Sequence, residues 1–368
     1  MPASDCITRD KKGTFRSPRG AVIRDKNELA RLRKMALPVQ YRDVCYATDP
    51  QATVQAVGRD HKSGRLQYRY HARHTAAQGR KKFARLLKFA KLLPPLRKAI
   101  RRTLQATRAR GRSKEHVTHQ ALRVLDQCRF RVGNPMYLQN NQSHGLSNLD
   151  SRHVKLKPNE ATIEFKGKAG QLNTCVIRDK DTLQYLRHRI RGGGRAASRL
   201  FEYVGDSGKT VGLHPQDVNR ALRAHGDITA KDFRTWQANL YFVEARIRGD
   251  DVPESVRHAA AQLYHTPAVC KSSYLHPALL AMDAAELRRV AGRAPPGRKK
   301  APAPVQAGGG GGKKKSAPQA AKAKARAPAP PLPPKHVEML ERCLYRLLRH
   351  VQVQGQGGRG RTKNGAVE

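Results

Sequence analysis

The sequence predicts an α+β fold in which a β-rich N-terminal domain precedes a mostly α-helical domain, with disordered basic tails. Two early segments, 52–57 and 64–71, have the composition of strands and are joined by a turn-rich loop. Downstream, most segments repeat apolar residues at helical spacing. A third observation is the stretch 291–334, which consists mainly of Ala, Pro, Gly and Lys, has no acidic residue and cannot pack a core.

The charge of the chain is strongly positive. Among 368 residues, 73 Lys and Arg face 28 Asp and Glu, a formal net charge of +45. An imbalance of this size favours a polyanionic partner, and nucleic acid is the polyanion that we expect. No apolar run has the length needed to cross a bilayer, and the N-terminus lacks the apolar core of a signal peptide. We therefore expect a soluble intracellular protein without a membrane partner.

The six cysteines are widely scattered and form no Cys-x-x-Cys pair. This spacing argues against a structural zinc site and against a disulfide framework. Since intracellular thiols are normally kept reduced, we expect all six cysteines to be thiols.

Shifts in composition divide the chain into five segments, and a basic, Gly-containing connector at 108–114 marks the boundary between the two domains. The predicted segments are a disordered basic tail (1–20), an N-terminal domain (21–107), a second domain (108–290), a disordered linker (291–334), and a C-terminal amphipathic helix with a Gly/Arg tail (335–368).

In the N-terminal domain, a helix is predicted over 26–37, before Pro38, and the strands at 52–57 and 64–71 follow. In the second strand, Tyr68 and Tyr70 lie on one face and Gln67 lies on the other. Such side chains suit contacts with phosphates and base edges, although an ordinary amphipathic strand would show the same alternation.

In the second domain, the pattern predicts a hairpin and a series of helices. The hairpin pairs 161–165 with 172–178 and carries Lys168 at its glycine-flanked tip. A capping box at 229–232 starts a helix with Arg234 in its first turn, where free N–H groups favour an anion, and with Trp236 in the core. The remaining predicted elements of this domain are a strand at 200–204 and helices at 116–130, 181–190, 215–225, 256–263 and 277–290. The N-terminal domain ends with a predicted helix at 81–104, broken at Pro94-Pro95.

The segment 264–276 places His265 nine residues before Tyr274, with a Thr-Pro break between them. A phenol among cations that favour its phenolate can attack a phosphate. Cys270 lies between the two and is interpreted as a packing residue.

Five residues supply the types that transfer of a phosphodiester to a tyrosine requires. Two guanidiniums can hold the non-bridging oxygens, a histidine can donate to one of them, and a lysine can protonate the departing 5′-oxygen. No metal is needed for this chemistry, and no Asp/Glu cluster suited to Mg²⁺ is visible. The candidate catalytic residues are Arg131, Lys168, Arg234, His265 and Tyr274.

The sequence resembles the type IB DNA topoisomerases of the small bacterial and poxvirus-like kind. The motifs that carry the match stand in the family's order over about residues 20 to 290. They are Gly-Arg-Leu-Gln-Tyr-Arg-Tyr-His at 64–71, Arg-Val-Gly-Asn at 131–134, Gly-Leu-Ser-Asn-Leu at 145–149 with Arg-His-Val at 152–154, Phe-Lys-Gly-Lys at 165–168, Lys-Asp-Phe-Arg-Thr-Trp at 231–236, and His-Thr-Pro at 265–267 leading to Tyr274.

The resemblance implies a clamp of two domains around duplex DNA that nicks one strand, holds the 3′-phosphate on tyrosine and reseals it without ATP, metal or any cofactor. It implies Tyr274 as the nucleophile, Lys168 as the general acid, and Arg131, Arg234 and His265 as transition-state stabilisers. It further implies DNA contacts by Gln67, Tyr68, Tyr70 and Tyr137. The expected partner is double-stranded DNA, bound by a monomer without a small-molecule substrate, in a nucleoid, nucleus or virion.

Two alternatives remain open at this point. A tyrosine site-specific recombinase shares the catalytic set, but usually has a histidine where Lys231 stands, and its N-terminal domain is helical. A basic architectural protein that only coats DNA would require all five residues to occur in order by chance.

Overall fold

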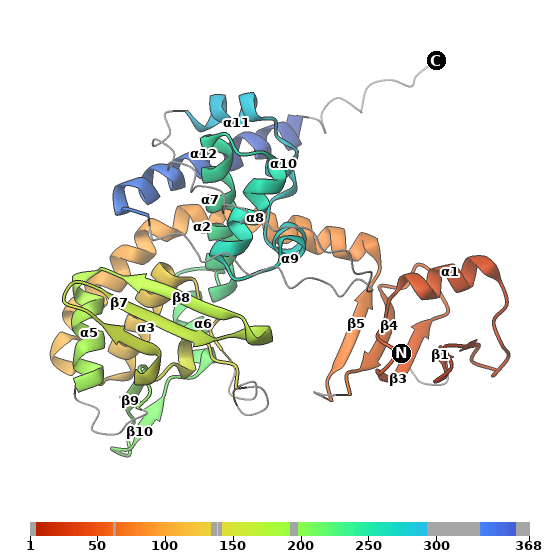
Figure 1. Ribbon diagram of the computed structural model, residues 1–368, viewed down its shortest axis with the longest axis horizontal. Helices are drawn as coiled ribbons and strands as arrows, with labels where there is room; N and C mark the ends of the chain where they lie inside the picture. Colours follow the sequence, from red (N-terminus) through yellow and green to blue (C-terminus); the bar gives the residue numbers. More distant parts are fainter. Residues whose placement is uncertain are drawn as a thin grey trace, which may run out of the picture. The chain divides into compact units, whose positions relative to one another are not determined.

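The computed structural model describes residues 5–61, 64–133, 138, 142–191, 198–292 and 332–357, which form two compact units divided between Ala84 and Arg85. The first unit is built on an antiparallel sheet and the second is mostly helical (Figure 1), which confirms the predicted α+β class. The linker predicted at 291–334 and the C-terminal Gly/Arg tail lie largely outside the described residues.

The first unit contains a five-stranded antiparallel sheet in the order β2-β1-β3-β4-β5, with one short helix. The predicted strand pair is confirmed, but the disorder predicted for 1–20 is wrong over the first two strands. The β1 strand pairs with β3 and buries Cys6 and Ile7, and no local pattern reveals such a distant partner. The elements are β1 (Cys6–Arg9), β2 (Phe15–Arg16), α1 (Lys26–Lys34), β3 (Arg42–Ala47), β4 (Val54–Arg59) and β5 (Leu66–Tyr70).

Helix α1 closes the core of this unit. The Asp25 carboxylate caps its first turn by accepting a hydrogen bond of 2.7 Å from the Glu28 N–H. Leu32, on the buried face of the helix, packs with Ile7 of β1 and Tyr46 of β3. Burial of these apolar side chains fixes the sheet and, with it, the exposed edge strand β5.

Helix α2 (Ala72–Ala106) is continuous, whereas the sequence predicts a break at Pro94-Pro95. Proline removes a helical hydrogen bond and crowds the preceding turn. Here Leu93 and Leu96 are both buried, so packing on either side of the prolines holds the helix together. The division between the units falls inside α2, after Ala84, rather than at the predicted 107–108.

The second unit combines a three-stranded antiparallel sheet, β6-β7-β8, with a two-stranded hairpin, β9-β10, and many helices. The predicted hairpin around Lys168 is confirmed. The single helix predicted over 277–290 is wrong, because Asp283 caps a new helix by accepting from the Glu286 N–H. The strands are β6 (Val154–Leu156), β7 (Ala161–Lys166), β8 (Leu172–Ile177), β9 (Glu202–Val204) and β10 (Thr210–Gly212).

The helices of this unit gather around α7, which lies almost entirely within the core. Trp236 on α7 is 2% exposed and contacts Phe89 of α2 at 5.9 Å between ring centroids, which confirms it as a core residue. The helices are α3 (Lys114–Cys128), α5 (Lys180–Arg191), α6 (Pro215–Arg223), α7 (Ala230–Arg248), α8 (Val252–Gln262), α9 (Pro267–Ser273), α10 (Pro277–Ala281), α11 (Ala284–Ala291) and α12 (Pro334–Gly357). Single 3-10 turns occupy Arg108–Arg110, Leu146–Asn148, Ser151–His153 and Lys168–Gly170.

Two disulfides, Cys6–Cys45 and Cys128–Cys175, contradict the expectation that all the cysteines are thiols. Their partners are 39 and 47 residues apart in the chain, and pairing of β1 with β3 and packing of α3 on β8 bring them together. Sequence spacing alone does not show such proximity. The second bridge joins the end of α3, just before Arg131, to the hairpin that carries Lys168.

The C-terminal helix α12 packs on α7 and α11. Its apolar face is buried, with Leu344 and Leu347 both fully covered. The Glu341 carboxylate accepts two hydrogen bonds from Arg97 of α2, at 2.8 and 2.9 Å. The sequence left the position of this helix undecided, and the structure makes it part of the helical core.

We expect Leu347→Ala on α12 to lower the free energy of unfolding by about 2–5 kcal/mol, because a buried leucine leaves a cavity when truncated. Chemical denaturation followed by circular dichroism measures the change. Exposed Val353 provides the control, since Val353→Ala on the same helix removes little buried area. Equal effects of the two substitutions would show that α12 does not pack as described.

The two disulfides predict how many cysteine thiols react before and after reduction. Protein purified without reductant and unfolded in denaturant should react with two equivalents of a thiol reagent, from Cys270 and Cys343, and with six after reduction. Six equivalents before reduction would contradict both bridges. Cys128→Ser and Cys45→Ser separate the two, because each should release one additional thiol.

Candidate active site

The segment that carries Tyr274 is held from both sides. Thr266 caps α9 by accepting from the Val269 N–H, and Tyr274 follows the last residue of this helix. Buried Asn239 of α7 donates to the Tyr274 carbonyl at 2.9 Å and accepts from the His276 N–H at 2.8 Å. This double contact fixes the backbone around the tyrosine. No local sequence pattern indicates this role of Asn239, since an asparagine inside a buried helix carries no signal of its partner.

The structure brings His265 and Tyr274 together, as their proposed joint role requires. Their rings stack at 4.5 Å between centroids, inclined by 27°. Nη2 of Arg234 lies 2.9 Å from Nε2 of His265, and Nη2 of Arg131 lies 3.4 Å from Nδ1 of the same ring. Four of the five predicted residues therefore form one contiguous group.

Arg234 is the most deeply buried member, at 3% exposed. Its guanidinium donates to the Leu263 carbonyl at 2.7 Å and to the Arg129 carbonyl. These two carbonyls lie two residues before His265 and Arg131, respectively. Arg234 thus fixes the backbone segments that lead into Arg131 and His265.

The electrostatic environment of the site disfavours further positive charge. Burial, reinforced by the charges of Arg234, Arg131 and Lys168, lowers the pKa of His265 to about 3, so the ring is neutral at neutral pH. Burial and the charge of Arg131 lower the pKa of Arg234 to about 10, which still leaves it charged. An anion placed here would relieve the repulsion between these groups.

A pocket of about 490 Å³ opens beside this group. It is cationic, and the sequence analysis did not assign Arg223 or Lys231 to it. Arg223 is the last residue of α6 and Lys231 lies in the first turn of α7, and a basic residue at a helix end is hard to distinguish from a solvated one in sequence. The charged and aromatic residues of its lining are Arg131, Arg223, Lys231, Arg234 and Tyr274.

Lys168 lies in the turn between β7 and β8, as predicted, and its side chain is exposed. The next residue, Ala169, has a left-handed backbone with φ 61°, which sharpens the turn. The charge of Lys168 contributes to the lowered pKa of His265. The hairpin is tied to the site by Tyr264, whose hydroxyl accepts from the Thr174 N–H at 2.8 Å and donates to the Thr174 carbonyl.

Burial raises the pKa of the Cys270 thiol to about 12. This thiol is fully covered, and it packs on the buried face of α9. The interpretation of Cys270 as a packing residue is confirmed.

In the first unit, the predicted DNA-contacting tyrosines Tyr68 and Tyr70 are exposed on β5, at 44% and 47%. Their rings stack at 6.2 Å, and Tyr70 also stacks on His74 at 5.1 Å. Gln67 is half-buried on the opposite face. Tyr137 lies outside the described residues.

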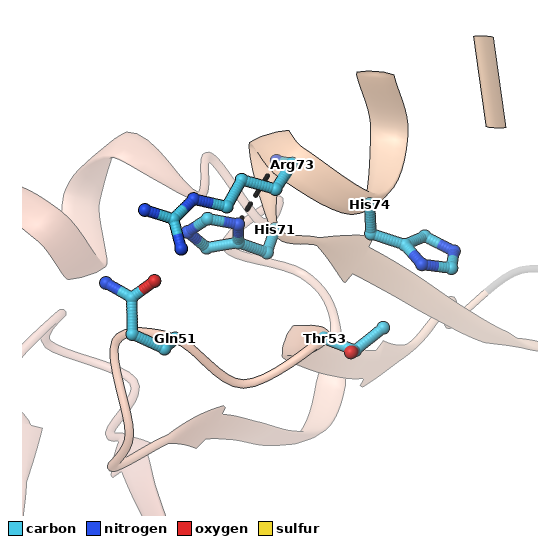
Figure 2. Close-up of a pocket in the computed structure, with 5 residues that line it drawn as sticks. All are labelled: Gln51, Thr53, His71, Arg73 and His74. Atoms are coloured by element: carbon cyan, nitrogen blue, oxygen red, sulfur yellow. Dashed lines mark hydrogen bonds between the residues drawn. The ribbon is translucent and has the colours of Figure 1, made fainter. Parts of the chain in front are cut away.

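A second pocket, of about 450 Å³, lies in the first unit where β5 meets α2 (Figure 2). His71 accepts at Nδ1 from the Arg73 N–H at 3.1 Å, which orients its ring. Basic and polar side chains dominate this pocket, and of its lining only His71 belongs to the motif at 64–71. The lining residues are Gln51, Thr53, His71, Arg73 and His74.

Comparison with known proteins agrees with this architecture. Residues 71–276 match the family model of the eukaryotic DNA topoisomerase I catalytic core, and residues 14–60 match that of the bacterial DNA topoisomerase IB N-terminal domain. DNA topoisomerase 1B of Acanthamoeba polyphaga mimivirus is 32% identical over 267 residues, covering 67% of this chain and 77% of the relative. DNA topoisomerase 1B of Vaccinia virus (strain Copenhagen) is 24% identical over 239 residues, covering 61% and 71%.

These matches cover both units and the whole segment that carries the site. The chain therefore belongs to the type IB DNA topoisomerase family, and its class is that of the isomerases that act on DNA. The resemblance stated from the motifs is confirmed, and topoisomerase is favoured over the recombinase and the architectural protein. In the part of the chain that the structure describes, no helix combines the length and apolarity needed to span a membrane.

The lowered pKa of His265 predicts a pH dependence of stability. An unfolded histidine binds a proton near pH 6.5, whereas the folded one does so near pH 3. The neutral ring therefore contributes stability fully above about pH 6.5, and this contribution is lost as pH falls toward 3. Denaturant unfolding at pH 7 and pH 5 should show a larger loss for the wild type than for His265→Gln. Equal losses would mean that His265 titrates normally.

Proposed function

We propose that this chain relaxes supercoiled duplex DNA by nicking one strand through Tyr274 and then resealing it, as a monomer that needs neither nucleotide nor metal. The observation that carries the proposal is the stacking of Tyr274 on His265 within contact of two buried or half-buried arginines. The family membership of the chain supports the same reaction.

In the proposed reaction, the Tyr274 hydroxyl oxygen attacks the scissile phosphorus and the bond to the 5′-oxygen breaks. The products are a 3′-phosphotyrosyl linkage and a free 5′-hydroxyl. Arg131 and Arg234 face the non-bridging oxygens, where negative charge grows, and guanidinium forks suit this geometry. Attack of the 5′-hydroxyl on the phosphotyrosine reverses the step and seals the strand, so no external energy source is consumed.

His265 is proposed to donate a hydrogen bond to one non-bridging oxygen. Both ring nitrogens lie beside an arginine, but a neutral ring can accept at only one of them, so the other carries the proton that would be donated to the phosphate oxygen. A neutral donor stabilises the transition state without adding a third charge to Arg131 and Arg234.

The DNA itself is proposed to be held by both units. Exposed Tyr68 and Tyr70, with Gln67 on the same strand, would contact the duplex, and Arg223 and Lys231 would pair with phosphates near the scissile bond. The net charge of +45 supplies the remaining attraction, which weakens with salt. We propose that the protein acts where the DNA of its source is kept, in a nucleoid, a nucleus or a virion.

The experiment that tests the function is relaxation of a supercoiled plasmid in EDTA without nucleotide. We expect the wild type to relax both positive and negative supercoils, and Tyr274→Phe to bind duplex DNA yet relax none and form no adduct stable to denaturant. Tyr203→Phe, on β9 and outside the pocket, is the matched control and should behave as wild type. A requirement for Mg²⁺ or ATP, or an adduct formed by Tyr274→Phe, would refute the proposal.

The role of Lys168 as general acid predicts a rescue. Lys168→Ala should slow cleavage of ordinary DNA by about 10²–10⁴-fold, since the 5′-oxygen leaves poorly without a proton. A substrate with sulfur in place of that oxygen has a leaving group that needs no proton, and the variant should regain most of the wild-type rate on it. Arg131→Ala should not recover, because it loses charge stabilisation.

Lys166 is the control, two residues away on the same hairpin and also exposed. Rescue of Lys166→Ala in place of Lys168→Ala would transfer the role of acid to Lys166. Rescue of neither would make the hairpin lysines DNA contacts only.

A further inference from the structure

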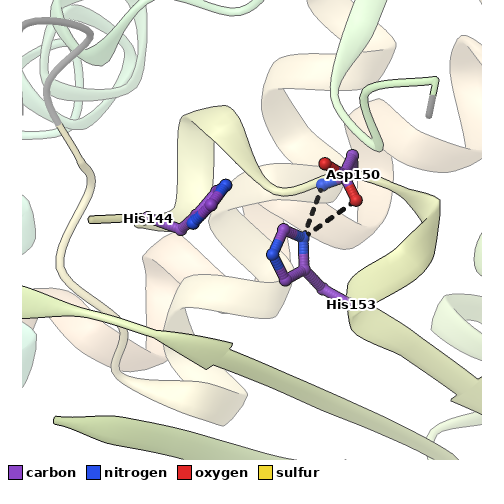
Figure 3. A group of neighbouring side chains, drawn as sticks. All are labelled: His144, Asp150 and His153. Carbon is purple, nitrogen blue, oxygen red and sulfur yellow. Dashed lines mark hydrogen bonds and ion pairs between the residues drawn. The ribbon is translucent and has the colours of Figure 1, made fainter. Parts of the chain in front are cut away.

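Three potential metal ligands meet away from the tyrosine pocket, between the end of α3 and the start of β6 (Figure 3). The rings of His144 and His153 lie 4.3 Å apart between centroids, and Nδ1 of His153 lies 3.1 Å from Oδ1 of Asp150. One ligand atom from each of the three residues lies within 4.8 Å of the others. The Asp150 N–H also donates to Nδ1 of His153 at 3.1 Å, so an ion bound at that nitrogen would replace this hydrogen bond.

The fold holds this cluster in place. Asp150 is 6% exposed, and His153 packs edge-on against Phe165 of β7 at 6.1 Å. His144 is anchored by its backbone N–H, which donates to the Lys166 carbonyl at 2.9 Å. The three side chains therefore come from a packed segment and not from a mobile surface.

We propose that His144, Asp150 and His153 bind one divalent transition-metal ion such as Zn²⁺, through one ring nitrogen of each histidine and one carboxylate oxygen. Imidazole and carboxylate together suit Zn²⁺, Co²⁺ or Ni²⁺, whereas Mg²⁺ and Ca²⁺ prefer oxygen ligands alone. Histidine ligates a metal through a ring nitrogen that carries no proton, so binding would release any proton held there.

The Arg152 side chain is the charged group that competes with the ion, beside the backbone N–H of Arg152, which donates to Oδ1 of Asp150 at 3.0 Å. Its guanidinium donates to Oδ2 of Asp150 at 2.7 Å and to Oδ1 at 3.3 Å. Its side chain is 65% exposed, so it can turn into solvent when the ion takes a carboxylate oxygen. Substitution of Arg152 by glutamine should therefore tighten metal binding, while loss of Asp150 should weaken it.

The ion would brace the segment that supports the candidate active site. The Leu146 N–H donates to the Arg131 carbonyl at 2.9 Å, and the Ser147 N–H donates to the Val132 carbonyl at 2.8 Å. Two residues earlier, His144 is bonded to Lys166, at the base of the Lys168 hairpin. The three ligands are not among the residues that line the pocket of Tyr274. The proposed ion would therefore stabilise the structure and take no part in the reaction.

The test uses the full chain without an affinity tag, stripped with EDTA and dialysed. Zn²⁺ binding is measured by calorimetry, and Co²⁺ binding by its visible d–d absorption. We expect one saturable site per chain. Its metal affinity should be at least about tenfold lower in His144→Ala and in Asp150→Asn. Since the chain has 15 histidines, exposed His188 on α5 gives the control, and His188→Ala should leave the affinity unchanged.

The proposal is overturned if the wild type shows no saturable site, or if His144→Ala and His188→Ala bind Zn²⁺ equally well. His153 packs against Phe165, so His153→Ala can fail to fold. His144→Ala, which removes no described core contact of that kind, keeps the test decisive. Neither DNA nor relaxation enters the measurement, so its result does not bear on the proposed topoisomerase reaction.

Discussion

The helical second unit depends on one buried cation, Arg234. Among the described residues, its guanidinium is bonded to two backbone carbonyls and to His265, with no carboxylate partner. Burying such a charge is costly, and carbonyl dipoles offset only part of the cost. The benefit of this arrangement is precise positioning, because one planar guanidinium group holds the segments that precede Arg131 and His265. A site that repels further positive charge is also one that a phosphate stabilises on binding.

Polar side chains with paired donors and acceptors then place the remaining groups. Asn239 spans the backbone on both sides of Tyr274, and the Tyr264 hydroxyl spans both backbone groups of Thr174 on the Lys168 hairpin. The Cys128–Cys175 bridge adds a covalent link between the same hairpin and the approach to Arg131. The groups that would act on a phosphate are thus held by contacts made elsewhere, which limits the reorganisation that the reaction needs.

Agreement between sequence and structure was best where the signal is local. The hairpin of β7 and β8, the helix start before Arg234 and the burial of Trp236 follow from turn residues, a capping box and apolar spacing. Sequence and structure disagree where a residue far away in the chain determines the local structure. Strand β1 forms because β3 pairs with it, α2 continues through Pro94-Pro95 because its flanks are buried, and two cysteine pairs meet only after folding.

The sequence by itself determined the family and the five residues proposed for catalysis, because their types and order in the chain carry that information. Only the tertiary structure decided that four of them touch or lie in one group around His265, that Asn239 and Tyr264 hold the segments in place, and that α12 belongs to the core. It also brought His144 to His153 and Asp150. The physical reason is that each residue type fixes the chemistry of its own side chain, whereas proximity depends on packing among segments that lie far apart in the chain.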